Sequence, residues 1–317
     1  MAMGALSGAI AFTYTAYCLN LALKKPAKAD SILPSTDPLV QSDAVDRKIV
    51  VRNEEGRELV PTGHSVVPLF PRTIELPSYG VPPQTSAVTT GSAPTEYTLV
   101  GLGLRTVTFI GFHVYLVGFY VATADVAALQ SALVKRFNPI ATTLVPGERE
   151  QLRNALLDPV QGEQIWEELL QRGVPARSAF RIAPVRDTDF AHLRDGFVRA
   201  VQSKTDAAVS DDRFGQAMRT FREVFNRGKA PKQTEILLVR ADDGKLVITY
   251  DDGVSKNGRP SGRQMLGTVD EERISRALWL NYLAGKRVAS EPARSNIVSG
   301  IMEFVERPIG TVATQVV

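Results

Sequence analysis

The sequence predicts an α+β domain built on an antiparallel sheet and preceded by a single membrane helix. Three observations support this prediction. Two segments, 97–122 and 234–253, alternate apolar and polar residues with period two; apolar residues recur at helical spacing in other segments; and an uncharged apolar run opens the chain. Because the strands occur as hairpins and do not alternate one by one with helices, the order favours an antiparallel sheet.

The opening run, Gly4 to Leu23, carries no charged side chain and is followed by Lys24, Lys25 and Lys28. A helix rises about 1.5 Å per residue, so this run is about 30 Å long, which matches the hydrocarbon core of a bilayer. We therefore predict a membrane anchor over residues 1–25. A targeting segment and a buried soluble helix are the alternatives.

The segment after the anchor is rich in proline, which removes backbone donors and disfavours long helices. We expect a tether over residues 26–62. From Val66 to Pro77 the chain is too apolar for a free linker, so we expect residues 63–96 to form an extended arm that packs on the folded domain, with an edge strand as one form of that packing.

The domain itself is expected over residues 97–317 and begins with a hairpin whose strands are separated at Gly111. Strand alternation groups Arg105 with Val107 on one side of the first strand, and His113 with Tyr115 on one side of the second. The remaining expected elements are helices in 123–136 and 147–172, apolar helical stripes in 190–201 and 214–225, a second hairpin with strands 234–239 and 245–253, and two closing helices that start near Asp270 and after Pro292.

Composition excludes several classes of function. The chain has one cysteine, Cys18, so it holds no internal disulfide framework and no four-thiolate metal site. It has three histidines and a formal net charge of +3, which gives no reason to expect a histidine-rich metal centre or a nucleic-acid partner. Function must therefore come from a local site.

Three blocks of the sequence resemble the chalcone isomerase family. The run GLGLRTVTFIGFHVYLVGFYVA (101–122) is similar to the opening hairpin of the family, with its strand-ending arginine at Arg105 and its G-x-Y motif at Gly118 to Tyr120. Residues 221–253 resemble the family's helix, proline-bearing loop and second hairpin, and residues 275–298 resemble its closing helices. The resemblance implies an antiparallel sheet covered on one face by helices, with a ligand cleft between sheet and helices.

The apolar N-terminus, the tether and the motif VPLFPRTIELP resemble the fungal mitochondrial branch of that family, the altered inheritance of mitochondria proteins. This resemblance implies a single-pass protein of the mitochondrial inner membrane. The alternative is a structural protein of that membrane whose cleft binds no ligand.

The resemblance also bears on catalysis, which in the family needs a cation where negative charge develops on the substrate carbonyl. Arg105 holds that position, because a guanidinium stays charged and presents several donors. The family's catalytic threonine position falls at Tyr115, and its other polar positions fall near Phe190, Phe197 and Gln264. Since phenyl rings cannot position a water, we expect no flavonoid isomerase activity. One alternative is an isomerase of the intramolecular-lyase type that acts on another substrate and uses Arg105 as electrophile. The other is that Arg105 has a structural role and pairs with a carboxylate at a sheet edge.

A cleft with one arginine and an aromatic lining suits a large apolar acid, and here the resemblance suggests haem or a fatty acid, with haem favoured. The expected lining is Arg105, Tyr115, Phe190, Phe197 and Gln264. Haem needs an axial ligand, usually a histidine. The candidates are His64 and His113, and His64 is preferred because a flexible arm can reach an open haem face.

Overall fold

The computed structural model describes residues 50–53, 56–79, 93–107, 111–205, 211–253, 255–256, 259–260 and 262–310. The chain divides into two compact units at Arg47 and Lys48, and the description concerns the second unit. The predicted anchor and most of the predicted tether lie outside the described residues. Among the residues described, no helix combines the length and apolar character needed to cross a membrane.

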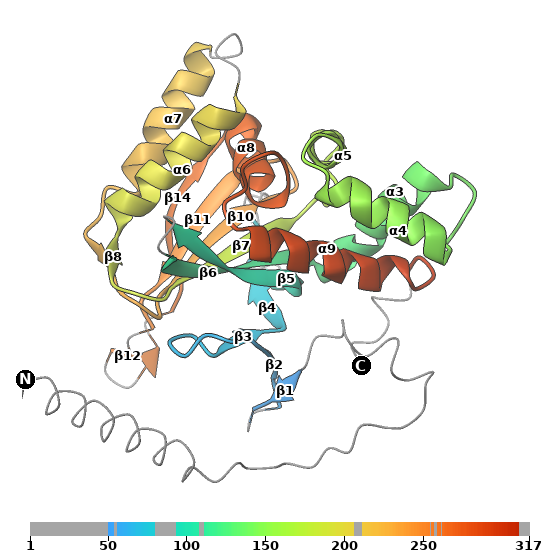
Figure 1. Cartoon of the computed structure of the whole chain (residues 1–317). Coiled ribbons are helices and arrows are strands. Elements are labelled where there is room, and N and C mark those ends of the chain that lie inside the picture. Colours follow the sequence, from blue (N-terminus) through green and yellow to red (C-terminus); the bar gives the residue numbers. More distant parts are fainter. Residues whose placement is uncertain are drawn as a thin grey trace, which may run out of the picture. The chain divides into compact units, whose positions relative to one another are not determined.

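The domain is organised around a curled antiparallel sheet of seven described strands in the order β14-β11-β10-β7-β6-β5-β4 (Figure 1). Every neighbouring pair in it is antiparallel, as the hairpin pattern predicted. The strands are β4 (Thr73–Leu76), β5 (Thr95–Val107), β6 (Phe112–Ala122), β7 (Ser178–Pro184), β10 (Glu235–Arg240), β11 (Leu246–Asp251) and β14 (Gln264–Val269).

Helices cover one face of this sheet, and a small set of strands lies against the other (Figure 1). The apolar stripe predicted for 214–225 is buried at Phe214, Met218 and Phe221, which confirms its core-facing role. The α-helices are α3 (Val126–Phe137), α4 (Pro146–Leu157), α5 (Gln161–Gln171), α6 (Phe190–Lys204), α7 (Asp212–Val224), α8 (Glu272–Leu283) and α9 (Glu291–Val305), and a 3-10 turn, η1 (Thr123–Asp125), precedes α3.

Aromatic side chains fill the interface between sheet and helices. Phe180 of β7 lies 5.0 Å from the Trp279 ring and 4.5 Å from the Tyr282 ring, centroid to centroid, and all three side chains are buried. The Trp279 and Tyr282 rings both belong to α8, so that helix is fixed against the central strand by large apolar contacts.

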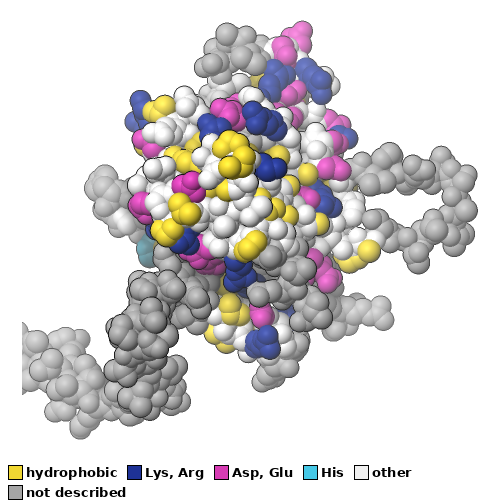
Figure 2. Space-filling model, turned by 90° about the vertical axis from the view of Figure 1, so that its right-hand side faces the viewer, with side chains coloured by type: hydrophobic (Ala, Val, Ile, Leu, Met, Phe, Trp, Pro, Cys, Tyr) yellow, Lys and Arg dark blue, Asp and Glu magenta, His cyan; other side chains and the backbone are white. Residues whose placement is uncertain are grey.

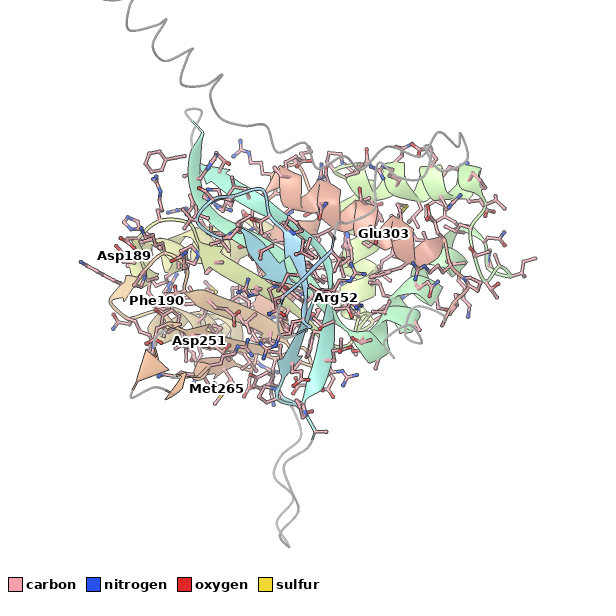
Figure 3. All side chains as sticks on the ribbon, turned by 90° about the horizontal axis from the view of Figure 1, so that it is seen from below. Arg52, Asp189, Phe190, Asp251, Met265 and Glu303 are labelled. Carbon is pink, nitrogen blue, oxygen red and sulfur yellow. The ribbon has the colours of Figure 1, made fainter. Side chains whose placement is uncertain are left out.

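Residues of the arm cover the opposite face of the sheet (Figure 3). Phe70 is fully buried there, and the hydroxyl of Tyr120 donates a hydrogen bond of 2.6 Å to the Pro71 carbonyl. The prediction that the arm packs on the domain is therefore confirmed for its described part, and β4 forms an edge strand beside β5. The arm strands are β1 (Val51–Arg52), β2 (Glu58–Pro61) and β3 (Leu69–Pro71).

Two features of the fold differ from the sequence expectation. The strands β1 and β2 fall within the range expected as tether, because they pair with each other and with β3. The strands β7 and β14 were not expected at all. The remaining short pairs are β8 (Thr188–Asp189) with β9 (Lys229–Ala230), and β12 (Ser255–Lys256) with β13 (Arg259–Pro260).

Two glycines allow α9 to approach β5 at backbone distance. A Cβ atom built on Gly101 would lie 2.5 Å from the Ile297 backbone, and one on Gly103 would overlap the Ala293 nitrogen. Any side chain at these positions would displace the helix. Gly101, Gly103 and Arg105 occupy alternate positions of the strand, so Arg105 is the next residue in the row that faces α9.

The surface of the domain is mixed in charge. On the side that carries α3, α4 and α5, basic and acidic side chains are interspersed with apolar ones (Figure 2). Such a distribution agrees with the near-balanced composition of 37 basic and 34 acidic residues.

Candidate functional site

Arg105 lies on the helix-covered face of the sheet, opposite Tyr115 in the β5–β6 register. Its guanidinium carbon is 5.6 Å from the centroid of the Tyr115 ring, and its Nη1 donates a hydrogen bond of 3.1 Å to the Ala289 carbonyl in the loop between α8 and α9. The side chain is partly buried. The arginine therefore points into the domain at the end of the hairpin, where strand, helix and loop meet.

Two tyrosine hydroxyls complete the polar group around this arginine. The Tyr115 and Tyr282 oxygens are 2.6 Å apart, and both side chains are buried. Burial raises the pKa of Tyr115, an effect that the Arg105 charge opposes, and burial raises the pKa of Tyr282 well above its usual value. Both phenols are therefore neutral at physiological pH and retain protons to donate. The Tyr115 hydroxyl in turn raises the pKa of Arg105, against the effect of burial.

Arg105 has no carboxylate within ion-pair distance among the described residues. The alternative of an arginine paired with a carboxylate at a sheet edge therefore finds no partner in the described structure. A partly buried charge without a counter-ion is costly, and this is the physical reason to expect an anionic ligand beside it.

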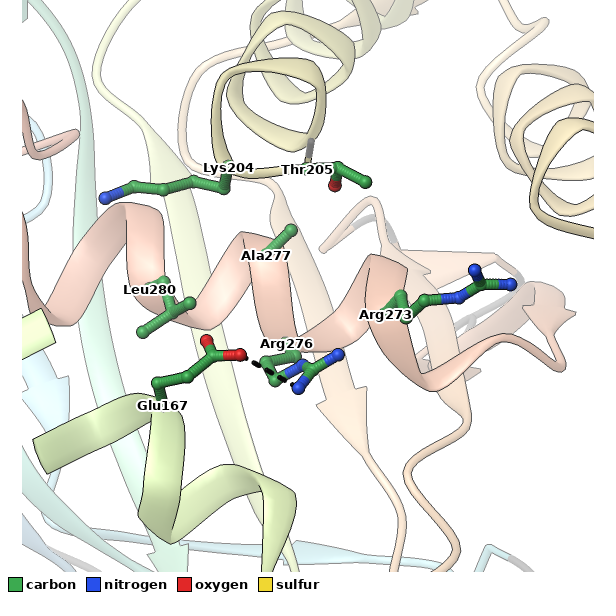
Figure 4. A pocket seen from close by; sticks show the side chains of 7 residues that line it. All are labelled: Glu167, Lys204, Thr205, Arg273, Arg276, Ala277 and Leu280. Atoms are coloured by element: carbon green, nitrogen blue, oxygen red, sulfur yellow. Dashed lines mark hydrogen bonds and ion pairs between the residues drawn. The ribbon is translucent and has the colours of Figure 1, made fainter. Parts of the chain in front are cut away.

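A separate pocket between α5, α6 and α8 shows the opposite arrangement (Figure 4). There Lys204 pairs with Glu163, and Arg276 pairs with Glu167 at 2.9 Å. Because the basic side chains of this pocket are already paired with carboxylates, the pocket should attract an anion less strongly than Arg105 does. The residues that line it are Glu167, Lys204, Thr205, Arg273, Arg276, Ala277 and Leu280.

Two of the aromatic residues expected in the ligand site lie in other packing. The Phe190 ring is 5.2 Å from the Tyr250 ring, and Phe197 is 5.5 Å from Phe225; both phenylalanines are buried. Figure 3 shows Phe190 close to Asp251, on the side of the sheet that carries β11 and β14. The rings of Phe190 and Phe197 therefore pack in the part of the core beneath α6 and α7.

Gln264 is also remote from Arg105 in the sheet. It is the first residue of the edge strand β14, its side chain is exposed, and four strands separate β14 from β5. The structure therefore brings together only Arg105 and Tyr115 of the expected lining, and the ligand-binding roles of the other three residues stay predictions.

The two candidate haem ligands meet each other, but on the other face of the sheet. The imidazole rings of His64 and His113 lie 5.5 Å apart with an edge-to-face geometry. His113 is exposed and His64 is half-buried. In the described chain, no group of three or more His, Cys, Asp or Glu side chains forms a metal site.

A β-bulge in β6 explains why His113 lies on the face opposite to Tyr115, against the expected alternation. Arg105 pairs with Tyr115, whereas the next residue, Thr106, pairs with His113, so Val114 is an extra residue in β6. An inserted residue reverses the parity of the strand beyond it. The sequence prediction that His113 and Tyr115 share a face is wrong for this reason.

Tyr282 is the member of the site that the sequence did not predict. Its helical spacing with Ile274 and Leu278 indicated only that it faces the core, which it does. Nothing in the sequence joined it to Tyr115, which is 167 residues away. A polar atom on an otherwise apolar helix face was the available signal, because a buried hydroxyl needs a partner.

Comparisons with known proteins agree with this architecture. Residues 95–298 match the family described as Chalcone isomerase like. Two relatives are named Altered inheritance of mitochondria protein 18, mitochondrial. The protein from Debaryomyces hansenii is 35% identical over 210 residues, which cover 66% of this chain and 67% of that protein. The protein from Kluyveromyces lactis is 31% identical over 214 residues, which cover 66% of this chain and 65% of that protein.

A solved structure gives the same picture of the fold. The crystal structure of a fatty-acid binding protein from Arabidopsis thaliana superposes with a TM-score of 0.50 at 16% sequence identity, and covers 81% of this chain and 99% of that chain. At this identity the likeness concerns the fold alone. The family match extends from β5 into α9, which is more than half of the chain, and it includes Arg105 and Tyr115. The chain therefore belongs to the chalcone isomerase-like family.

Proposed function

We propose that this protein binds a large apolar acid through Arg105 and does not perform flavonoid chemistry. The observation that carries the proposal is the partly buried guanidinium with no carboxylate partner among the described residues. A guanidinium matches a carboxylate with parallel hydrogen bonds, and the neutral Tyr115 hydroxyl beside it is a further donor. The apolar residues of the sheet and helices suit a long or flat apolar body.

The relatives support where such a protein would act. Those reported above are named mitochondrial, and the plant protein of similar fold is named a fatty-acid binding protein. We propose a mitochondrial location with an inner-membrane anchor over residues 4–23. Cell fractionation followed by protease treatment of the tagged full-length protein tests this location. The tag should be recovered with isolated mitochondria and be protected there from added protease. Recovery of the tagged protein in the cytosolic fraction would contradict the proposal.

Arg105→Ala tests the binding proposal. Loss of a charge-assisted hydrogen bond costs about 1.5–3 kcal/mol, so binding of dodecanoic acid to the full chain should weaken by about 10- to 100-fold in calorimetric titration. Arg199→Ala, which removes an exposed arginine of α6, is the matched control. Unchanged affinity in Arg105→Ala contradicts the proposal, as does a wild-type protein that binds no apolar acid.

Haem is the candidate ligand that the imidazole pair favours. The Nδ1 atom of His64 accepts a hydrogen bond of 3.2 Å from the Val66 nitrogen, which engages the ring within the arm. No hydrogen bond to the His113 ring is recorded among the described residues, and the ring is exposed. His113 is therefore the better axial ligand of the two, with His64 beside it. Haem, when bound, supplies an iron whose properties depend on this ligand.

The position of the histidines separates the haem proposal from the Arg105 site. His113 faces the arm and Arg105 faces the helices, so one closed pocket cannot contain both side chains. Haem held by His113 would thus not need Arg105 as its principal anchor. A fatty acid, which needs no axial ligand, would occupy the helix-facing site.

Visible spectra of the full chain with added haem distinguish these cases. We expect His113→Ala to abolish the spectrum of histidine-ligated haem, His64→Ala to weaken it and Arg105→Ala to retain it. His192→Ala is the matched control, since His192 is an exposed residue of α6 that contacts Asp189, the residue before the helix. A wild-type protein that stays colourless with haem contradicts haem binding, and a spectrum unaffected by His113→Ala contradicts the assigned ligand.

The isomerase alternative has a direct assay. We expect no cyclisation of a chalcone above the uncatalysed rate, because Tyr115 occupies the position that the resemblance assigns to the family's catalytic threonine. Cyclisation that disappears in Arg105→Ala would show that Arg105 acts as an electrophile and would overturn the proposal of binding without chemistry.

A further inference from the structure

A second arginine stands at the exposed end of the same hairpin. The guanidinium carbon of Arg186 lies 3.6 Å from the centroid of the Phe112 ring, closer than the other recorded arginine–aromatic contacts of the described chain. Phe112 is 46% exposed. The stacked ring holds the guanidinium in a fixed orientation at the surface through a cation–π contact.

Arg186 resembles Arg105 in its lack of a counter-ion. No ion pair of Arg186 is recorded within the described residues, although Asp187 follows it directly in the sequence. The backbone around it is fixed, since the Val185 nitrogen donates a hydrogen bond to the Val114 carbonyl of β6. Stacking on a ring occupies the flat side of a guanidinium and leaves the N–H groups at its edge free to bind an anion.

The strand register places Phe112, with its stacked arginine, on the same face as Arg105. Phe112 pairs with Val107, and Val107 is two residues from Arg105 on β5, so Phe112, Tyr115 and Arg105 share one face. Two residues of strand span about 7 Å. The exposed pair Arg186–Phe112 therefore lies next to the buried pair Arg105–Tyr115, as an outer and an inner cation separated by aromatic rings.

We infer that the site takes an apolar molecule with two acidic groups, one held by Arg105 and the other by Arg186 on Phe112. This inference rests on the proposed binding of an acid at Arg105 and narrows the ligand class. A monocarboxylic acid leaves the outer guanidinium without a partner, whereas a dicarboxylic acid satisfies both. A diacid of medium chain length has this chemistry, because its two carboxylates are separated by about the spacing of neighbouring side chains on adjacent strands.

Paired ligands test the inference on the full chain. Calorimetry should show that decanedioic acid binds about five- to tenfold more tightly than decanoic acid, which is the effect expected of one additional charge-assisted contact at a partly exposed site.

Variants at the outer position separate this inference from the proposed function. Arg186→Ala should remove the preference for the diacid and leave decanoic acid binding unchanged, while Arg105→Ala should weaken both acids. Arg186→Lys keeps the charge but loses the flat stacking, and should recover only part of the preference. Arg199→Ala is again the control.

Two results would overturn the inference alone: equal affinity of wild-type protein for the diacid and the monoacid, or a diacid preference that persists in Arg186→Ala. If neither acid binds the wild-type chain, the proposed function fails, and the inference fails with it. Since Arg186 is half-buried, circular dichroism of the variants is used to show that the fold is retained.

Discussion

The two faces of the β5–β6 hairpin are held in different ways. On the helix-covered face, Gly101 and Gly103 bring the backbone of α9 into direct contact with the strand, and Arg105 continues the same row. On the arm-covered face, Gly118 meets the Phe70 ring, a side chain, at 2.9 Å for a built Cβ atom. Backbone against backbone has little room to relax, whereas a ring can shift, so the arm is the more adaptable cover.

The faces also differ in chemistry. The helix face buries two neutral phenols beside a cation, and the arm face brings two imidazoles together near solvent. The bulge at Val114 is what separates them, since it turns His113 away from Tyr115. One hairpin end therefore presents a guanidinium to one side and two imidazoles to the other.

The largest expected effect is a loss of stability on substitution of the glycines that separate the two faces from their covers. Gly103→Ala should lower the free energy of unfolding by about 3 kcal/mol, because the new methyl group would press on the α9 backbone. Gly118→Ala should cost about 1 kcal/mol, because the Phe70 ring can move. Urea denaturation of the full chain measures both. Gly196→Ala, which has open space around it in α6, should stabilise by about 0.5–1 kcal/mol and serves as control. Equal losses at Gly103 and Gly118 would contradict the contrast between the faces.

Next in size are the buried hydroxyls. Tyr282→Phe removes the partner of the Tyr115 hydroxyl, and Tyr120→Phe removes the bond to the Pro71 carbonyl; each should cost about 1–2 kcal/mol. Hydrogen exchange distinguishes the effects of the two variants on the arm. Tyr120→Phe should speed exchange in β3 of the arm, and Tyr282→Phe should leave the arm protected. Faster arm exchange in both variants would mean that the two faces are not independent.

An acid-dependent effect is expected to be smaller, since it comes from one titrating group. Glu235 lies between Arg181 and Arg263, with contacts to each. Burial opposes ionisation, but the two guanidiniums outweigh it and lower the pKa of this carboxyl. Its stabilising contribution is therefore full above the unfolded-state pKa of about 4.3 and is lost as pH falls through the lower folded-state pKa.

The matched variant isolates that contribution. The difference in unfolding free energy between wild type and Glu235→Gln should be constant near pH 6 and should shrink as pH falls below about 4. Because Arg181 also stacks on Phe70, at 4.3 Å from the ring centroid, this titration reports on the arm-covered face. A difference that does not vary between pH 3 and pH 6 would contradict the assignment.

The smallest expected effect is at the imidazole pair. His64→Ala removes one ring contact and the Nδ1 acceptor of the Val66 nitrogen, both at a half-buried position, and should cost less than about 1 kcal/mol. Thermal unfolding of this variant, compared with His192→Ala, measures the loss. A cost comparable to that of Gly103→Ala would show that the arm is held as rigidly as α9.

Several elements followed from local pattern. The turn at 241–244 and its flanking alternation predicted β10 and β11, and their register is regular throughout. The strand β7 escaped prediction because it is central and buried on both faces, so it shows no alternation; Arg181 in its middle also disguises it. The strand β14 escaped because its apolar residues, Met265, Leu266 and Val269, show no regular alternation and Gly267 interrupts them.

The sequence by itself determined the fold family, the hairpins and the core-facing stripes of the helices, and it made Arg105 a candidate ligand-binding residue, because these depend on local periodicity and on motifs read along the chain. Only the tertiary structure decided that Tyr282 meets Tyr115, that Phe112 holds Arg186, and that His113 turns toward His64. Contacts between distant segments depend on the path of the whole chain. The face of a strand residue depends on every bulge before it, and a single inserted residue such as Val114 leaves no mark in the sequence pattern.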